Sequence, residues 1–245
     1  MRWLKAVSDI FLPRTCIVCG RKLLLHEEHL CLYCLADMPR THFWSSDHNP
    51  MADRFNARIQ EHDLVAGERY AYACALFFYR DSSPYRNILY DLKYKGNISV
   101  GRYFGRMLGR KLSSSRSFHD VDCIVPVPLH WRRRWKRGYN QAEVIASAIA
   151  SETGIPLHAD LLRRIRHTGT QTKLATEDKR INVRGAFEVG SGLEAAADPG
   201  FSHILIVDDV FTTGSTLLAC FVALRSVFPP SVRISVATFG FVGGE

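Results

Sequence analysis

The chain has 245 residues, of which 47% are hydrophobic, enough to bury the core of one full α/β domain with a small additional module. No apolar run approaches the roughly 20 residues that span a bilayer, and residues 1–12 lack the long apolar region and cleavage site of a signal peptide, so we expect a cytoplasmic protein without a membrane span. Lysine and arginine number 32 against 24 acidic residues, and this net charge of +8 favours anionic partners, either phosphorylated metabolites or nucleic acid.

Four of the seven cysteines form two C-x-x-C pairs near the N-terminus, Cys16 with Cys19 and Cys31 with Cys34. This spacing is typical of a structural zinc ribbon, in which four thiolates complete the tetrahedron and leave no open position for water. Two redox pairs or unligated thiols are the alternative, and a histidine between the pairs, His26 or His29, could also replace one thiolate. Because so short a segment can hardly build its own core, zinc should supply its folding energy.

The sequence becomes polar and irregular over residues 39–63, which predicts a domain junction. We expect an N-terminal helix and zinc ribbon over residues 1–45, a linker over residues 46–66, and the main domain over residues 67–245.

The main domain should begin with a strand within residues 70–79, followed by a helix that ends in Lys93-Tyr94-Lys95-Gly96. Lys93 and Lys95 have two interpretations: they compensate the helix dipole in solvent, or they contact an anionic ligand. A second helix over residues 100–112 has arginines at i, i+4 spacing, and such a stripe is most simply an exposed face.

Residues 121–125 predict a buried parallel strand that ends at Pro126. A loop that faces phosphate is expected at the carboxyl end of such a strand. We therefore predict that pyrophosphate binds at the loop formed by Val127, Pro128, Leu129 and His130.

The most basic part of the chain follows this loop directly. It consists of Trp131, Arg132, Arg133, Arg134, Trp135, Lys136 and Arg137. Its cations could neutralise pyrophosphate, or they could bind single-stranded nucleic acid whose bases stack on the tryptophans. A plain solvated surface is the third interpretation.

After an amphipathic helix over residues 141–153, the polar stretch 163–173 is long enough to form a flap over the site or an exposed hairpin. A flap would exclude water from a reacting sugar carbon. Gln171, together with Arg180 further along, is a candidate flap or anion contact.

The stretch from Ile204 to Thr216 has the strongest functional signal. Four apolar β-formers end at two acids, and a loop of hydroxyl residues and glycine then enters an apolar-periodic segment, which indicates a strand, a loop and a helix. Helix N-termini bind phosphate through free backbone N–H groups, whereas carboxylates repel it. The acids therefore suit ribose hydroxyls, directly or through Mg²⁺. Helix capping alone would explain one hydroxyl but not the acid pair.

This arrangement predicts a site for a 5-phosphoribosyl group, and neither the Walker A spacing nor Gly-x-Gly-x-x-Gly is present at the loop. Asp208 and Asp209 are the candidate catalytic residues. The candidate ligand-binding set is Asp208, Asp209, Thr212, Thr213, Gly214, Ser215 and Thr216.

The same run resembles the phosphoribosyl-pyrophosphate (PRPP) loop of type I phosphoribosyltransferases. The order of the cysteine pairs, Lys-Tyr-Lys-Gly, Pro-Val-Pro-Leu-His, Arg-Gly-Tyr-Asn-Gln-Ala and this loop is similar to the ComF/GntX family, over nearly the whole chain. The resemblance implies an α/β fold, a mostly parallel sheet flanked by helices, with an N-terminal four-cysteine zinc ribbon. It also implies PRPP with Mg²⁺ as ligand, structural Zn, and a role in natural transformation or the use of imported DNA.

Three functions remain open from the sequence. The first is a PRPP-binding protein that contacts single-stranded DNA and works with other competence or DNA-processing proteins. The second is a phosphoribosyltransferase of nucleotide salvage or synthesis, in the glycosyltransferase class. The third is a zinc-ribbon nucleic-acid adaptor with a vestigial PRPP site.

Overall fold

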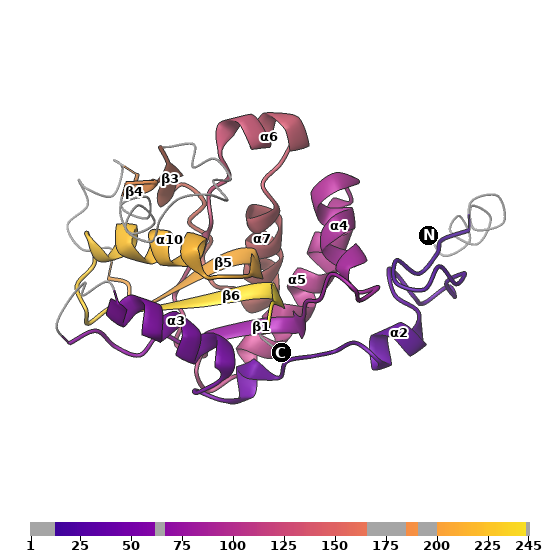
Figure 1. Cartoon of the computed structure of the whole chain (residues 1–245), viewed down its shortest axis with the longest axis horizontal. Coiled ribbons are helices and arrows are strands. Elements are labelled where there is room, and N and C mark those ends of the chain that lie inside the picture. Colours follow the sequence, from indigo (N-terminus) through magenta and orange to yellow (C-terminus); the bar gives the residue numbers. More distant parts are fainter. Residues whose placement is uncertain (1–12, 62–66, 166–184, 191–199, 244–245) are drawn as a thin grey trace.

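A parallel four-stranded sheet forms the centre of the molecule, in the strand order β1-β6-β5-β2 (Figure 1). The computed structural model describes residues 13–61, 67–165, 185–190 and 200–243. The strands of the sheet are β1 (Ala73–Phe78), β2 (Cys123–Pro126), β5 (His203–Phe211) and β6 (Arg233–Phe241). Their nearly continuous burial explains why their sequences are apolar runs rather than alternating patterns. The expected α/β fold with a mostly parallel sheet is confirmed.

Helices cover both faces of this sheet (Figure 1). One face carries α5 (Ile98–Ser113) and α7 (Gln141–Thr153), and the other carries α3 (Pro50–Glu61) and α10 (Ser215–Arg225). The shorter elements are α2 (Leu32–Ala36), η1 (Phe43–Ser45), α4 (Arg86–Tyr94), α6 (Trp131–Arg137) and the antiparallel pair β3 (Leu162–Arg164) and β4 (Phe187–Val189). None of the helices in the described ranges has the length and apolarity needed to cross a bilayer.

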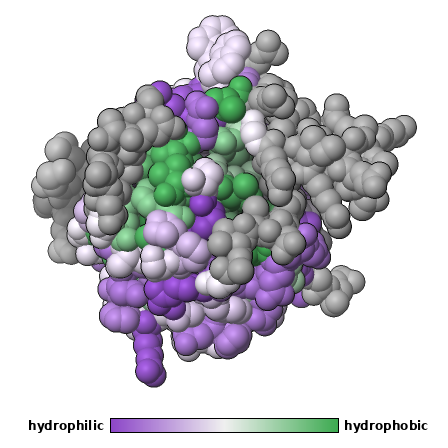
Figure 2. All heavy atoms as spheres, turned by 90° about the vertical axis from the view of Figure 1, so that its left-hand side faces the viewer, coloured by the Kyte–Doolittle hydropathy of each residue, from purple (hydrophilic) through white to green (hydrophobic). Residues whose placement is uncertain are grey.

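The carboxyl ends of the parallel strands point to the right in Figure 1. The opposite end, turned to the viewer in Figure 2, shows a group of hydrophobic residues with hydrophilic residues below it. Candidate ligand-binding residues follow β2 and β5, so the site belongs to the carboxyl end of the sheet.

Glycines allow α5 and α7 to pack in close contact. Gly101, Gly105 and Gly109 lie one turn apart along α5 and face α7. A Cβ atom on Gly105 would lie 2.6 Å from the Ala148 Cβ and 3.0 Å from the Ile145 carbonyl oxygen, closer than real side chains pack. Each of these glycines directly precedes one of the regularly spaced arginines of α5, so a glycine face toward α7 lies beside the arginine stripe.

The stretch expected to be an irregular linker contains a regular helix, α3. Asn49 caps this helix by accepting hydrogen bonds from the N–H groups of Met51 and Ala52, at 3.1 and 3.0 Å. The helix then buries Phe55 against Phe211 and Phe221, with ring centroids 6.3 and 5.9 Å apart. An asparagine followed by proline is a helix start signal, so the expectation of a polar, irregular junction at these residues was wrong. The domain boundaries at residues 45 and 66 stay a prediction.

The cysteine module, defined here as residues 13–36, packs against α4 and α5. The Tyr85 hydroxyl donates to the Cys34 carbonyl at 2.8 Å, and the Asn87 amide donates to the Ile17 carbonyl at 3.0 Å. Arg106 on α5 lies 3.7 Å from Glu28. Hydrogen bonds and an ion pair thus attach the module to the larger part of the molecule.

Candidate functional site

The strand connections create a topological switch point between β2 and β5. After β2, the chain passes through α7 and reaches Leu157, which pairs with Ile124 at the outer edge of the sheet. After β5, it passes through α10 on the opposite face and returns as β6, on the other side of β5. In open α/β sheets a crevice for ligands forms where two such connections diverge, outside the carboxyl ends of the strands.

Strand register brings the two predicted anion loops together at this point. Pro126 pairs with Val207, and the Val127 N–H donates to the Val207 carbonyl at 2.9 Å. The predicted pyrophosphate loop therefore begins beside the acid pair. The side chains of Val127 and His130 are buried and those of Pro128 and Leu129 are half-buried, so a ligand would meet mainly the loop backbone.

The Arg-Gly-Tyr-Asn-Gln segment holds this loop, the start of α7 and the end of α4 together through hydrogen bonds. The Asn140 amide donates to the Val127 carbonyl at 3.0 Å while its oxygen caps α7 through the Ala142 N–H. The Tyr139 hydroxyl donates to the Leu92 carbonyl near the end of α4. This segment thus connects three elements around the switch point, which gives it a structural role.

Asp208 and Asp209 are half-buried at the carboxyl end of β5, and the strand continues past them to Phe211. The Asp209 N–H donates to the Asp208 carboxylate at 2.8 Å. Burial, followed by the neighbouring negative charge of Asp209, raises the pKa of Asp208 to about 7, although that N–H group and the charges of Lys93 and Arg164 oppose the shift.

The two lysines at the end of α4 have different partners. The Lys93 ammonium lies 3.0 Å from an Asp209 carboxylate oxygen, with both side chains largely shielded from solvent. The Lys95 ammonium pairs instead with Asp91 at 2.9 Å, on its own helix. Of the two, the structure brings only Lys93 into contact with the acid pair.

The loop at residues 212–216 leads into the eleven-residue helix α10. Gly214 has φ +77°, and a Cβ atom there would lie 2.7 Å from the Phe211 ring, so the position requires glycine on both counts. The hydroxyls of Thr213 and Ser215 are 2.9 Å apart. Thr212, Thr213 and Thr216 are exposed at this helix start, where phosphate groups bind.

Sequence reasoning missed a cation at this loop, Arg58 of α3. Its guanidinium donates to the Ser215 hydroxyl at 2.8 Å. The signal that could have found it is the Asn49-Pro50 helix start, because residues 54 and 58 then share a helix face at i, i+4 spacing. Gln171 and Arg180, the other candidate contacts, lie outside the described residues.

Helix α6 presents its tryptophans to solvent directly after the pyrophosphate loop. Trp131 is 66% exposed and Trp135 is 89% exposed. Arg134 lies 3.7 Å from Glu143, and Arg137 donates to Gln141 at 2.8 Å. The side chains of Arg132, Arg133 and Lys136 lie outside the described part of the molecule.

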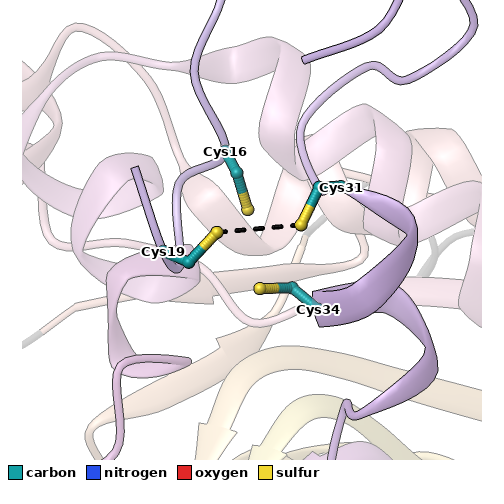
Figure 3. A group of neighbouring side chains, drawn as sticks. All are labelled: Cys16, Cys19, Cys31 and Cys34. Carbon is teal, nitrogen blue, oxygen red and sulfur yellow. Dashed lines mark hydrogen bonds between the residues drawn. The ribbon is translucent and has the colours of Figure 1, made fainter. Parts of the chain in front are cut away.

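The four predicted metal ligands form a compact cluster with their sulfurs directed toward one another (Figure 3). The Sγ atoms of Cys16, Cys19, Cys31 and Cys34 all lie within 4.8 Å of one another, and those of Cys19 and Cys31 are 3.7 Å apart. Zinc–sulfur bonds of about 2.3 Å in a tetrahedron place the sulfurs roughly 3.8 Å apart. The cluster is therefore consistent with a zinc site, and in the described residues no histidine joins it.

Backbone groups favour a thiolate within this cluster. Burial raises the pKa of Cys16, but the N–H groups of Cys19, Cys31 and Val18 outweigh that effect and lower the pKa to about 7. Deprotonated sulfur is the form that binds a metal.

Comparison with known proteins agrees with this geometry. Residues 139–240 match the model of the phosphoribosyl transferase domain family. The chain is 29% identical to Competence protein F of Haemophilus influenzae over 154 residues, which are 62% of this chain and 66% of that protein. It is 30% identical to the DNA utilization protein YhgH of Salmonella typhi over 137 residues, 55% of this chain and 58% of that protein. Identity to YhgH of Escherichia coli O157:H7 is 27% over 205 residues, 82% of this chain and 80% of that protein.

The first two of these alignments cover less than two thirds of the relative's length, 66% of Competence protein F and 58% of the Salmonella typhi protein. The domain match begins at Tyr139, so it includes α7, β5, α10 and β6 but not α3, β1 or β2.

Proposed function

We propose that this chain binds PRPP and acts in DNA uptake or the use of imported DNA, because residues 139–240 match the phosphoribosyl transferase domain family and the chain is similar to Competence protein F and the YhgH proteins. The proposal extends to contact with single-stranded DNA and to work alongside other competence or DNA-processing proteins. Its support comes first from the relatives' names and then from the site itself.

One observation carries the PRPP assignment: the pairing of Pro126 with Val207 at the switch point. Because β2 and β5 are adjacent and parallel, a loop suited to pyrophosphate and a loop suited to a 5-phosphate leave the same edge of the sheet. The acid pair lies on β5, just before the hydroxyl-rich loop. A ligand with a phosphate at one end and a pyrophosphate at the other fits this arrangement of two anion-binding loops and an acid pair.

Different groups of the described residues bind different parts of this ligand. Backbone N–H groups and hydroxyls at residues 212–216 bind the 5-phosphate, and the backbone of residues 127–130 binds pyrophosphate. Asp208 and Asp209 accept hydrogen bonds from the ribose hydroxyls or ligate Mg²⁺, which neutralises pyrophosphate charge when bound. The Lys93 ammonium lies beside the acid pair, so on ligand binding it can donate to an anionic oxygen of the ligand in place of the Asp209 carboxylate.

Any transfer reaction would break the bond between the anomeric carbon and pyrophosphate while an acceptor forms the new bond. The described groups at the site position and neutralise charge, so catalysis would rest on orientation and electrostatics and would need no covalent enzyme intermediate.

Exposure of Trp131 and Trp135 supports single-stranded DNA as the partner of α6. Two water-exposed tryptophans on a basic helix can serve as stacking platforms for bases. Because α6 begins at the end of the pyrophosphate loop, single-stranded DNA bound to α6 would lie beside the PRPP site.

Calorimetry with PRPP and Mg²⁺ tests the ligand. At pH 8, above the pKa of Asp208, Asp208→Asn should weaken PRPP binding about tenfold, because it removes an anionic acceptor for ribose hydroxyls or Mg²⁺. Lys95→Gln serves as a charge-changing control outside the acid pair. Wild-type protein that fails to bind PRPP would refute the proposal, and pyrophosphate release with a free nucleobase would instead establish a salvage enzyme.

Fluorescence anisotropy with a labelled oligothymidine tests the DNA contact. Trp135→Ala should weaken binding about 5- to 160-fold, since stacking on one base is worth roughly 1–3 kcal/mol. Tyr33→Ala is the matched control, because Tyr33 is an exposed aromatic, 72% accessible, on the cysteine module. Equal losses in both variants would contradict a specific role of α6.

A further inference from the structure

We infer that Arg58 of α3 is a phosphate-binding residue, which contacts the 5-phosphate of the phosphoribosyl ligand at the start of α10. The inference rests on the proposed PRPP site and adds a ligand contact from a helix that precedes the matched phosphoribosyl transferase region.

The Arg58 guanidinium reaches the loop through a specific contact. It donates to the Ser215 hydroxyl at 2.8 Å, and Ser215 is the first residue of α10. The same hydroxyl lies 2.9 Å from that of Thr213. Arg58 thus belongs to a hydrogen-bonded group whose other members line the predicted phosphate position.

The phosphate loop itself lacks a cation. Residues 212–216 consist of threonines, glycine and serine, and the strand before them carries an acid pair near its end. A dianionic phosphate bound there would gain partial positive charge from the helix dipole but no full charge from the loop. Arginine has five N–H donors in a planar fork, so Arg58 can keep its bond to Ser215 and still donate to phosphate oxygens.

Helix α3 is held firmly enough to position this side chain. The Asn56 amide donates to the Ala71 carbonyl at 2.8 Å, and its oxygen accepts from the Ala71 N–H at 2.9 Å, which joins the helix to the approach of β1. Phe55 packs against Phe211, whose ring also contacts the Gly214 position. The helix and the phosphate loop therefore share one packed support.

Titration calorimetry with ribose 5-phosphate, PRPP and inorganic pyrophosphate tests the role of Arg58. Arg58→Gln should weaken ribose 5-phosphate and PRPP about 10- to 100-fold, the value of a hydrogen bond to a charged group, and leave pyrophosphate unchanged. Arg58→Lys should recover part of the loss, because it keeps the charge but not the fork.

Arg54→Gln is the matched control. Arg54 lies one turn earlier on the same helix and donates to the Val242 carbonyl at 2.9 Å, so its loss removes the same charge without touching the loop. Ribose 5-phosphate affinity should stay within twofold of wild type in this variant. An equal loss in both variants would show a general charge effect and overturn the inference.

Other outcomes separate this inference from the proposed function. Wild-type protein that binds neither ribose 5-phosphate nor PRPP refutes both. Wild-type binding with unchanged affinity in Arg58→Gln refutes the Arg58 contact alone. If Arg58→Gln does not fold by circular dichroism, Arg58→Lys decides: a loss for ribose 5-phosphate but not pyrophosphate supports the contact, and unchanged affinity refutes it.

Discussion

The Lys93 ammonium lies 3.0 Å from a carboxylate oxygen of Asp209, so the end of α4 neutralises part of the acid pair at the end of β5. The contact joins two segments that are far apart in sequence. It places a cation at the point where an anionic ligand would otherwise meet two adjacent carboxylates.

Replacement of Lys93 should therefore weaken PRPP binding. In Lys93→Met, Asp209 loses its partner and repels the ligand, so the dissociation constant should rise about tenfold. Lys95→Met is the control, since Lys95 pairs with Asp91 on its own helix. Calorimetry should show less than a twofold change for Lys95→Met, and equal effects of the two substitutions would contradict a special role of Lys93.

Ionisation of Asp208 should make stability depend on pH. In the folded protein this carboxyl keeps its proton to a pKa of about 7, whereas the unfolded chain loses it near 3.8. Between these values the folded state binds more protons, so this group's contribution to stability is greatest below pH 3.8 and falls as pH rises to 7.

Asp208→Asn cannot ionise and escapes that loss. Denaturant unfolding in magnesium-free buffer should show that the advantage of Asp208→Asn over wild type grows between pH 4 and 7 and then levels off. A difference that is constant across this range would show that Asp208 titrates normally.

Zinc should stabilise the cysteine module and be present in a one-to-one ratio. Cys19→Ser should abolish zinc binding with little direct loss of packing, because Cys19 is the exposed member of the cluster. His26→Ala is the control, since this exposed histidine lies outside the cluster. Elemental analysis and thermal unfolding measure both effects, and an equal zinc content in the two variants would contradict the four-cysteine site.

Gly105→Ala should destabilise the contact between α5 and α7 by about 1–3 kcal/mol through overpacking. The direction is informative because alanine in a helix is otherwise more favourable than glycine by about 1 kcal/mol. Ala148→Gly removes the atom that lies 2.6 Å from the added Cβ, so the double variant should recover part of the loss. Chemical denaturation gives the free energies, and a stabilising Gly105→Ala would show that the helices separate at no cost.

Local patterns were sufficient for the sheet and the helices beside it. The helix predicted over residues 141–153 is α7 with the same bounds, because its asparagine cap and following glycine mark both ends. The buried strands were visible as apolar runs. Helices α3 and α6 were not predicted: α3 has few apolar positions and a start signal that resembles a turn, and the residues of α6 were interpreted only as a basic run.

The sequence by itself determined the chemistry of this protein: two cysteine pairs, an acid pair before a hydroxyl-rich loop, and a basic run with two tryptophans. These signals are local, because each depends on residue types a few positions apart. Only the tertiary structure decided which distant groups meet, bringing Lys93 to Asp209 and Arg58 to Ser215 while turning Lys95 away. Strand order and helix packing set those contacts, and neither is encoded in the spacing of neighbouring residues.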